Sequence, residues 1–201
     1  MMEAVIYLAS RSPRRRELLH QIGVSHRLID IEVDEQVRAG ESPSDYVLRL
    51  SQDKAVAGLA ARQGGESLPV LAADTCVVID GQMLGKPADP QEGLSMLQRL
   101  SGATHRVYTA VALDDGRLAT RLSVSEVSFR SLSEAEMAAY WATGEPADKA
   151  GGYAIQGLAA QFVRELRGSY SGVMGLPLFE TAELLRDAGI ELLRPKTVNE
   201  R

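Results

Sequence analysis

The sequence predicts an α/β fold in which a mixed central β-sheet is flanked by helices. A short apolar run at residues 4–9 leads straight into a helix start, the pattern of a strand followed by a crossover. Asp80-Gly81 and residues 114–116 are hairpin signals between apolar runs. Crossovers join parallel strands and hairpins join antiparallel ones, so a sheet that contains both connections is mixed.

The first third of the chain predicts a strand, a helix, a second strand, a loop and a long helix. These are expected over residues 4–9, 13–22, 26–31, 32–44 and 44–63. Ser12 is a good N-cap, Pro13 suits the first helical position, and Gly23 is a natural stop. The long helix has an apolar stripe at helical spacing, and Lys54 falls inside that stripe.

Glycine and capping residues divide the rest of the chain. Gly64-Gly65 ends the long helix, Asp89 and Ser133 start later helices, and the tail from Lys196 is expected to be mobile. Strands are expected over residues 70–73, 77–79, 105–113, 118–129 and 158–166. Helices are expected over residues 89–101, 133–143 and 176–188, and glycine-rich loops over residues 151–157 and 168–175.

The composition and length of the chain limit the kinds of partner and the number of domains that it can have. The 201 residues contain 22 Lys plus Arg against 27 Asp plus Glu, a formal charge of −5, which argues against a nucleic-acid polymer as partner. At roughly 150 residues per domain, we expect a single domain over residues 1–201. A split into two lobes around an active-site cleft would fall near residues 101–131.

The lack of a recognisable secretory signal or membrane span predicts a cytoplasmic protein. Cys76 is the single cysteine, which excludes an intramolecular disulfide and fits a reducing compartment. No apolar run approaches the roughly 18 residues that a membrane span needs. The first four residues lack the basic start of a secretory signal. We therefore expect no membrane partner.

The segment from Ser10 to Arg16 predicts a phosphate-binding turn. The start of a helix attracts anions, yet residues 14–16 place three arginines there, against the helix dipole. A bound polyanion would offset that repulsion, and arginine grips phosphate oxygens in pairs. The alternative is a solvated basic patch or a salt bridge to an acid such as Glu17.

Other residues are chemically suggestive but ambiguous by themselves. Asp74 follows an apolar strand, where it could ligate a metal, take a proton from water or simply cap a turn. Lys54 could snorkel to solvent or point inward to a phosphate, and Lys86 could be an ordinary surface lysine. The loop at residues 151–157 could hold a nucleobase or surround a core tyrosine. The acidic cluster around Glu35 could be surface or help to hold a divalent ion.

Blocks of sequence resemble the Maf family of nucleoside triphosphate pyrophosphatases. In chain order, they are Leu8–Arg15 (LASRSPRR), Ala73–Thr75 (ADT), Gly85–Pro87 (GKP), Lys149–Gly157 (KAGGYAIQG), Gly168–Tyr170 (GSY) and Val173–Leu178 (VMGLPL). The resemblance spans nearly the whole chain. It implies a fold similar to that of the inosine triphosphate pyrophosphatases, a homodimer, a divalent metal (Mg²⁺ or Mn²⁺) and cleavage between the α and β phosphates.

The resemblance also implies roles for single residues. Asp74 matches the family's proton acceptor, and Glu35 an acidic position near the metal. The specificity positions correspond to Arg14, Thr75 and Gln156. The phosphate-binding positions correspond to Ser10, Arg15, Lys54 and Lys86. The pairing of Asp74-Thr75 with residues 155–157 resembles the branch that acts on dTTP and UTP.

Two other functions stay open on the sequence. One is a nucleotide sensor that restrains cell division without turnover. The other is a pyrophosphatase for another nucleotide, such as a modified pyrimidine nucleotide or 7-methyl-GTP.

Overall fold

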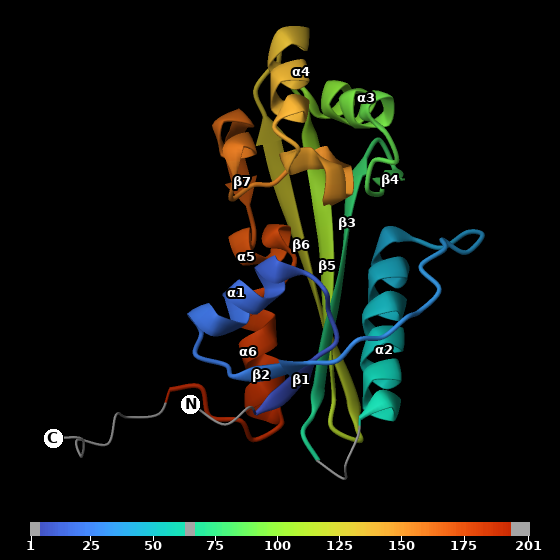
Figure 1. Ribbon diagram of the computed structural model, residues 1–201, viewed down its shortest axis with the longest axis vertical. Helices are drawn as coiled ribbons and strands as arrows, with labels where there is room; N and C mark the ends of the chain where they lie inside the picture. Colours follow the sequence, from blue (N-terminus) through green and yellow to red (C-terminus); the bar gives the residue numbers. More distant parts are fainter. Residues whose placement is uncertain (1–4, 63–66, 194–201) are drawn as a thin grey trace, which may run out of the picture.

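The computed structural model describes residues 5–62 and 67–193. These residues form a mixed sheet of seven strands in the order β2-β1-β3-β5-β6-β7, with β4 paired to β3 (Figure 1). The strands are β1 (Ile6–Leu8), β2 (His26–Leu28), β3 (Val70–Ile79), β4 (Gln82–Leu84), β5 (Thr104–Asp114), β6 (Leu118–Phe129) and β7 (Val163–Arg167). The predicted mixed α/β architecture is confirmed.

Helices cover both faces of this sheet (Figure 1). The α-helices are α1 (Pro13–Gln21), α2 (Pro43–Ala61), α3 (Pro90–Leu100), α4 (Glu134–Ala142), α5 (Tyr170–Met174) and α6 (Leu178–Asp187). Short 3₁₀ turns occur at η1 (Glu145–Asp148), η2 (Ala150–Gly152) and η3 (Leu158–Phe162). Among the described residues, no helix combines the length and apolar content needed to cross a bilayer.

Of the four apolar clusters in the described residues, the two largest cores lie at opposite ends of the long strands. At one end α3 and α4 cover the sheet, burying residues such as Leu97 and Phe129. At the other end α1 and α6 bury Leu19 and Leu185 against Leu71. Strands β3, β5 and β6 contribute to both cores.

Local capping chemistry places most helix starts where the sequence predicts them. Ser133 and Glu136 form a complete capping box at α4, and Asp89 accepts a hydrogen bond from the Glu92 amide at α3. Asp80 and Gly81 both have positive φ, as a two-residue hairpin turn requires. The predictions for Gly64-Gly65 and for the tail from Lys196 lie outside the described residues.

The predicted interruption of the third strand at Asp74-Thr75 is wrong. β3 runs unbroken from Val70 to Ile79, because β5 pairs with it along almost its entire length. The two polar residues do not break the strand, since pairing with β5 continues through both of them and their side chains have polar partners.

Three other predicted elements differ from the structure. The strand expected at 158–166 begins only at Val163, and residues 158–162 form a 3₁₀ turn instead. The loop expected at 168–175 contains the helix α5, whose N-cap Ser169 accepts from the Gly172 amide. The strand expected at 26–31 ends at Leu28, where its pairing with β1 stops.

Candidate active site

A gap along one edge of β3 positions the candidate site. The parallel strand β1 pairs with β3 only at Val70 and Leu71, and the antiparallel β4 pairs with it only from Val77 onward. In the described part of the chain, residues 72–76 therefore have no strand on that side. The carboxyl end of β1 points toward this gap, the usual place for ligands in α/β sheets.

Strand alternation sends two neighbouring polar side chains to opposite faces of β3. Successive side chains of a strand point to opposite sides of the sheet. Asp74 therefore lies on the α2 side, where Lys54 reaches it. Thr75 lies on the other side, where its hydroxyl oxygen accepts from Thr109 at 3.0 Å and from Arg15 at 3.4 Å. Both side chains reach the same opening, because the sheet edge is free there.

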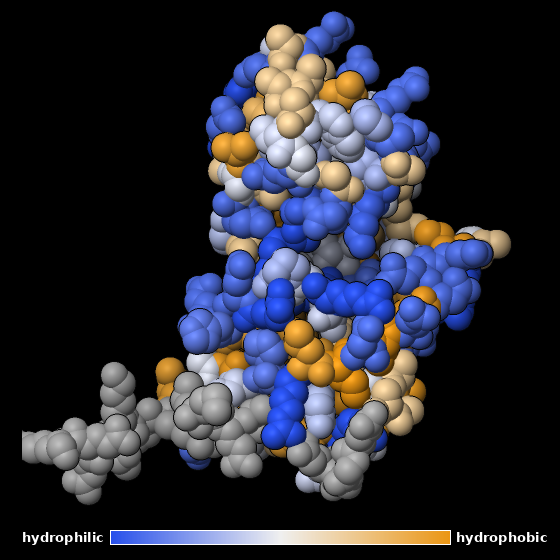
Figure 2. Space-filling model, viewed as in Figure 1, coloured by the Kyte–Doolittle hydropathy of each residue, from blue (hydrophilic) through white to orange (hydrophobic). Residues whose placement is uncertain are grey.

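The gap opens into a cavity of about 1040 Å³. All nine residues singled out from the sequence line it: Ser10, Arg14, Arg15, Glu35, Lys54, Asp74, Thr75, Lys86 and Gln156. Hydrophilic side chains crowd the middle of this face of the molecule, between the two ends of the sheet (Figure 2). The structure thus gathers residues that are up to 146 positions apart in the sequence, from Ser10 to Gln156.

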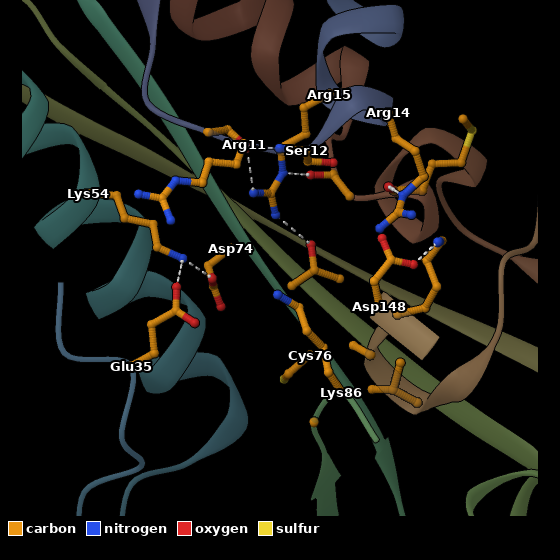
Figure 3. Close-up of a pocket in the computed structure, with 18 of the residues that line it drawn as sticks. Arg11, Ser12, Arg14, Arg15, Glu35, Lys54, Asp74, Cys76, Lys86 and Asp148 are labelled. Atoms are coloured by element: carbon orange, nitrogen blue, oxygen red, sulfur yellow. Dashed lines mark hydrogen bonds and ion pairs between the residues drawn. The ribbon is translucent and has the colours of Figure 1, made fainter. Parts of the chain in front are cut away.

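Lys54 bridges two carboxylates at the cavity wall (Figure 3). Its Nζ lies 2.7 Å from Asp74 Oδ1 and 2.6 Å from Glu35 Oε1. The alternative in which Lys54 snorkels to solvent is wrong, since the residue is buried. Lys54 interrupts the apolar stripe of α2 because its partner lies on the sheet beneath that stripe.

The two carboxylates differ in proton affinity. Burial raises the pKa of Asp74, and the negative charge of Glu35 adds to that effect, while Lys54 and Arg15 oppose it. Burial alone would also raise the pKa of Glu35, but the hydrogen bond and charge of Lys54 lower it overall. A pair of carboxylates whose environments push their pKa values apart is a feature of acid–base sites.

The turn after β1 presents donors to the cavity. The side chain of Ser12 does not cap α1, although Ser12 occupies the N-cap position. Arg15 donates to the Gly175 carbonyl at 2.7 Å and to Ser10 Oγ at 3.2 Å, which fixes its guanidinium across the floor of the turn. These partners are neutral, so the positive charge of Arg15 is not cancelled by a paired acid.

Arg14 and Lys86 approach the cavity from different elements (Figure 3). Arg14 donates to the Met174 carbonyl at 3.3 Å, and burial lowers its pKa. Asp148 faces Arg14 and raises the pKa of that guanidinium by its charge, in opposition to burial. Arg16 is exposed and lies outside the cavity lining, so the three arginines of the helix start do not act together.

The glycine-rich segment after η1 brings Gln156 to the rim. Gln156 is exposed and lines the cavity. The expectation that residues 151–157 surround a core tyrosine is confirmed, because the Tyr153 ring packs edge-on against Phe129 and its hydroxyl lies 2.7 Å from His105 Nε2.

Residues 5–188 match the family model described as "Maf-like protein". The chain belongs to the Maf family. It is 60% identical over 192 residues to the dTTP/UTP pyrophosphatase of Alkalilimnicola ehrlichii, covering 94% of this chain and 95% of that protein. It is 59% identical over 185 residues to the dTTP/UTP pyrophosphatase of Saccharophagus degradans, covering 90% and 88%.

A solved structure is less similar to this Maf-family chain in sequence than these two relatives are. The nucleoside-triphosphatase / dITP/XTP pyrophosphatase of Mycobacterium abscessus is 20% identical, with a TM-score of 0.37. The match covers 62% of this chain and 72% of that one.

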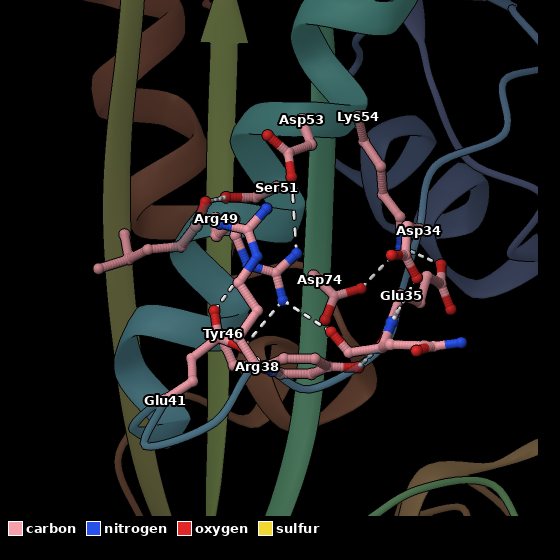
Figure 4. Close-up of polar contacts among 12 residues, drawn as sticks. Asp34, Glu35, Arg38, Glu41, Tyr46, Arg49, Ser51, Asp53, Lys54 and Asp74 are labelled. Carbon is pink, nitrogen blue, oxygen red and sulfur yellow. Dashed lines mark hydrogen bonds and ion pairs between the residues drawn. The ribbon is translucent and has the colours of Figure 1, made fainter.

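A polar network behind Glu35 was not found from the sequence (Figure 4). Arg49 donates two hydrogen bonds to Glu41, at 2.6 and 2.8 Å, and a third to the Gln36 carbonyl at 3.1 Å. The Arg49 hydrogen bond is the main reason that the pKa of Glu41 falls to about 2. Tyr46 donates to the Glu35 carbonyl at 3.0 Å.

This network holds the loop that carries Glu35 against α2, so Glu35 can reach Lys54. Nothing in the local sequence pattern signals it. Arg49 looks like any exposed position of an amphipathic helix, and the network becomes visible only when the loop folds back on α2.

Proposed function

We propose that this Maf-family chain hydrolyses dTTP and UTP between the α and β phosphates, giving the monophosphate and pyrophosphate. The observation that carries the proposal is the buried Asp74 carboxylate in the same cavity as the cations Arg14, Arg15, Lys54 and Lys86. That combination suits a reaction in which a water attacks a highly charged phosphate chain. The choice of dTTP and UTP as the substrates comes from the names of the two relatives, each a dTTP/UTP pyrophosphatase.

The cations bind and orient the triphosphate. Arg15 is held by Gly175 and Ser10, so its position is set before the substrate arrives. The uncapped start of α1 adds backbone N–H donors at the same turn. Arg14 and Lys86 reach in from the sides of the cavity.

Asp74 takes the proton of the attacking water. Burial raises its pKa, so it binds a proton more strongly than an exposed carboxylate does, while the nearby Lys54 ammonium favours the ionised form that accepts the proton. As the proton moves to Asp74, the water oxygen bonds to phosphorus, and the bridging P–O bond between the α and β phosphates breaks. The electron pair of that bond leaves with pyrophosphate.

The donor set of the cavity fits a divalent cation. Asp74 and Glu35 each give one carboxylate oxygen to Lys54 Nζ, at 2.7 and 2.6 Å, so the second oxygen of each carboxylate is the one that would bind a cation. In the described residues no group of three or more His, Cys, Asp or Glu gathers, so Asp74 and Glu35 would hold Mg²⁺ or Mn²⁺ together with substrate phosphates. When bound, the ion would neutralise charge on the phosphate oxygens.

Gln156 and Thr75 supply pyrimidine selectivity in this proposal. A side-chain amide offers both a donor and an acceptor, which suits the donor–acceptor edge of uracil and thymine. A base that leaves those groups unpaired is rejected strongly. The cytoplasmic location, the homodimer and a role in removing modified pyrimidine nucleotides or restraining cell division remain predictions.

A panel of nucleotides tests the proposal. The purified protein would be incubated with Mg²⁺ and dTTP, UTP, CTP, GTP, ITP or 7-methyl-GTP, with products resolved by anion-exchange chromatography. We expect dTMP and UMP with pyrophosphate and little product from purines. Preferential turnover of 7-methyl-GTP would overturn the selectivity assigned to Thr75 and Gln156. Tight dTTP binding without any turnover would instead favour the nucleotide sensor.

A further inference from the structure

Gln156 lies on a tight turn whose geometry is set from outside the cavity. The Gly157 amide donates to the Ala154 carbonyl at 3.0 Å and closes the turn. Before the turn, Tyr153 is buried and its hydroxyl lies 2.7 Å from His105 Nε2. Ala154 and Ile155 of the turn are buried, whereas Gln156 is exposed and Gly157 half-buried, so the exposed half of the turn depends on what holds its flanks.

Tyr140 holds the first flank. Its hydroxyl oxygen accepts a hydrogen bond from the Ala154 amide at 3.1 Å, and the hydroxyl donates to Glu145 Oε1 at 2.7 Å. Tyr140 is only 4% exposed, and its ring packs edge-on against Phe162. A tyrosine fixed by its ring in a core can place its hydroxyl with little freedom.

Glu145 holds the second flank. Its Oε2 accepts from the Leu158 amide at 3.0 Å, and its Oε1 accepts from the Ala159 amide at 3.4 Å. A Cβ on Gly157 would lie 2.2 Å from the same carboxylate, so the carboxylate occupies the space that any other residue would need there. Glu145 therefore contacts the turn closely as well as bonding to its far side.

We propose that Tyr140 and Glu145 are positioning residues for Gln156 and so set nucleotide selectivity from behind the cavity. Together they bond to the backbone on both sides of Gln156, at Ala154 and at Leu158. Neither belongs to the cavity lining. The inference rests on the proposed function, in which Gln156 reads the base. We call these contacts of Tyr140 and Glu145 with the backbone the clamp. Without the clamp, the turn samples more conformations, and the side-chain amide of Gln156 loses its fixed direction toward the base.

The variant Tyr140→Phe tests the clamp, because it removes the hydroxyl and keeps the ring. We expect the ratio of kcat/KM for dTTP over dCTP to fall about three- to tenfold, the size of one net hydrogen bond. In a Gln156→Ala background, Tyr140→Phe should change this ratio no further. Glu145→Gln, which alters the other flank, should act in the same direction. Thr181→Val, which deletes a buried hydroxyl bonded to the Pro177 carbonyl at 2.7 Å in α6, is the matched control.

Amide hydrogen exchange of residues 154–159 without nucleotide supplies a second readout. Faster exchange in Tyr140→Phe, together with a selectivity loss that depends on Gln156, supports the inference. Unchanged exchange overturns it, as does an equal selectivity loss in the Gln156→Ala background or in Thr181→Val. If the wild-type protein hydrolyses neither dTTP nor UTP, the proposed function fails, and the exchange rates alone decide whether the clamp exists.

Discussion

The pKa of Asp74 is set by two opposing effects, burial and the charges of neighbouring side chains. The carboxylate is 8% exposed, lies 2.7 Å from Lys54 and shares that lysine with Glu35. Burial raises the pKa of Asp74, and the charge of Lys54 opposes that rise. Burial, together with the charge of Asp74, also raises the pKa of the neighbouring Cys76 thiol to about 12.

We predict that Asp74→Asn lowers kcat by about two to four orders of magnitude and preserves nucleotide binding. The amide keeps the size of the carboxylate but cannot accept the proton from water. Pyrophosphate release measures turnover, and equilibrium dialysis with dTTP measures binding. Asp115→Asn, on the exposed hairpin turn, is the control. Near-normal turnover in Asp74→Asn would rule out the role of proton acceptor.

At Arg14 the expected defect is in substrate affinity. Arg14→Ala should weaken triphosphate binding about 10- to 100-fold, because a charged hydrogen-bond donor to phosphate is lost. Arg16→Ala is a close control, since Arg16 is exposed and lies outside the cavity. Steady-state kinetics with dTTP would separate KM from kcat, and unchanged constants for Arg14→Ala would refute phosphate binding by this residue.

At the scale of elements, the site depends on strands that stop early. β1 leaves β3 after Leu71 and β4 joins it at Val77, so the intervening edge stays open. The loop after β2 then folds back onto α2 and delivers Glu35 to the opening. Arg49 and Glu41 tie that loop to the helix, with side chains 12% and 7% exposed.

Removing this tie should impair the site as much as removing Glu35. We expect Arg49→Met to lower kcat/KM for dTTP about tenfold, the effect of misplacing a group that binds in the transition state. Arg49→Met combined with Glu35→Gln should be no worse than Glu35→Gln alone. Arg106→Met, which breaks an exposed pair with Glu126, should have little effect. Additive losses in the double variant would show that Arg49 acts elsewhere.

At the scale of the whole molecule, the two largest apolar cores share β3, β5 and β6, and Val77 and Ile155 of the core beneath α3 and α4 also line the cavity. A buried histidine that the proposed chemistry does not use packs against Phe129 of the core beneath α3 and α4. His105 is 2% exposed, and burial lowers its pKa to about 4. Its Nδ1 has no hydrogen-bond partner among the described residues. A neutral imidazole therefore packs against this core.

The buried histidine makes stability depend on pH. Between about pH 6.5 and 4 the unfolded chain binds a proton at His105 that the folded chain excludes, so the free energy of unfolding falls as pH falls. Over this pH range, His105 lowers the free energy of unfolding by about 3 kcal/mol. Urea unfolding at pH 7 and pH 4 would measure it. His105→Gln should remove most of this dependence, and His20→Gln, at an exposed position, should not. An unchanged pH dependence in His105→Gln would contradict the assignment.

The sequence by itself determined the parts of this protein that depend on local chemistry. Alternation, helical periodicity and turn residues predicted the mixed sheet and nearly every helix, and the caps at Asp89 and Ser133 act as expected. The arginines after Ser12 predicted a phosphate-binding turn because they oppose the helix dipole there, and two of them, Arg14 and Arg15, line the cavity. The roles of Thr75 and Gln156 came from the family resemblance, since an isolated threonine or glutamine has no local signature.

Only the tertiary structure decided which side chains meet. It shows that β3 continues through Asp74, because pairing with β5 outweighs the local signal of a break. It directs Lys54 onto Asp74, buries Tyr153 against His105 and joins Arg49 to Glu41. These contacts link residues on different elements, and short-range sequence patterns carry no record of them, because the geometry exists only once the sheet and its helices have packed.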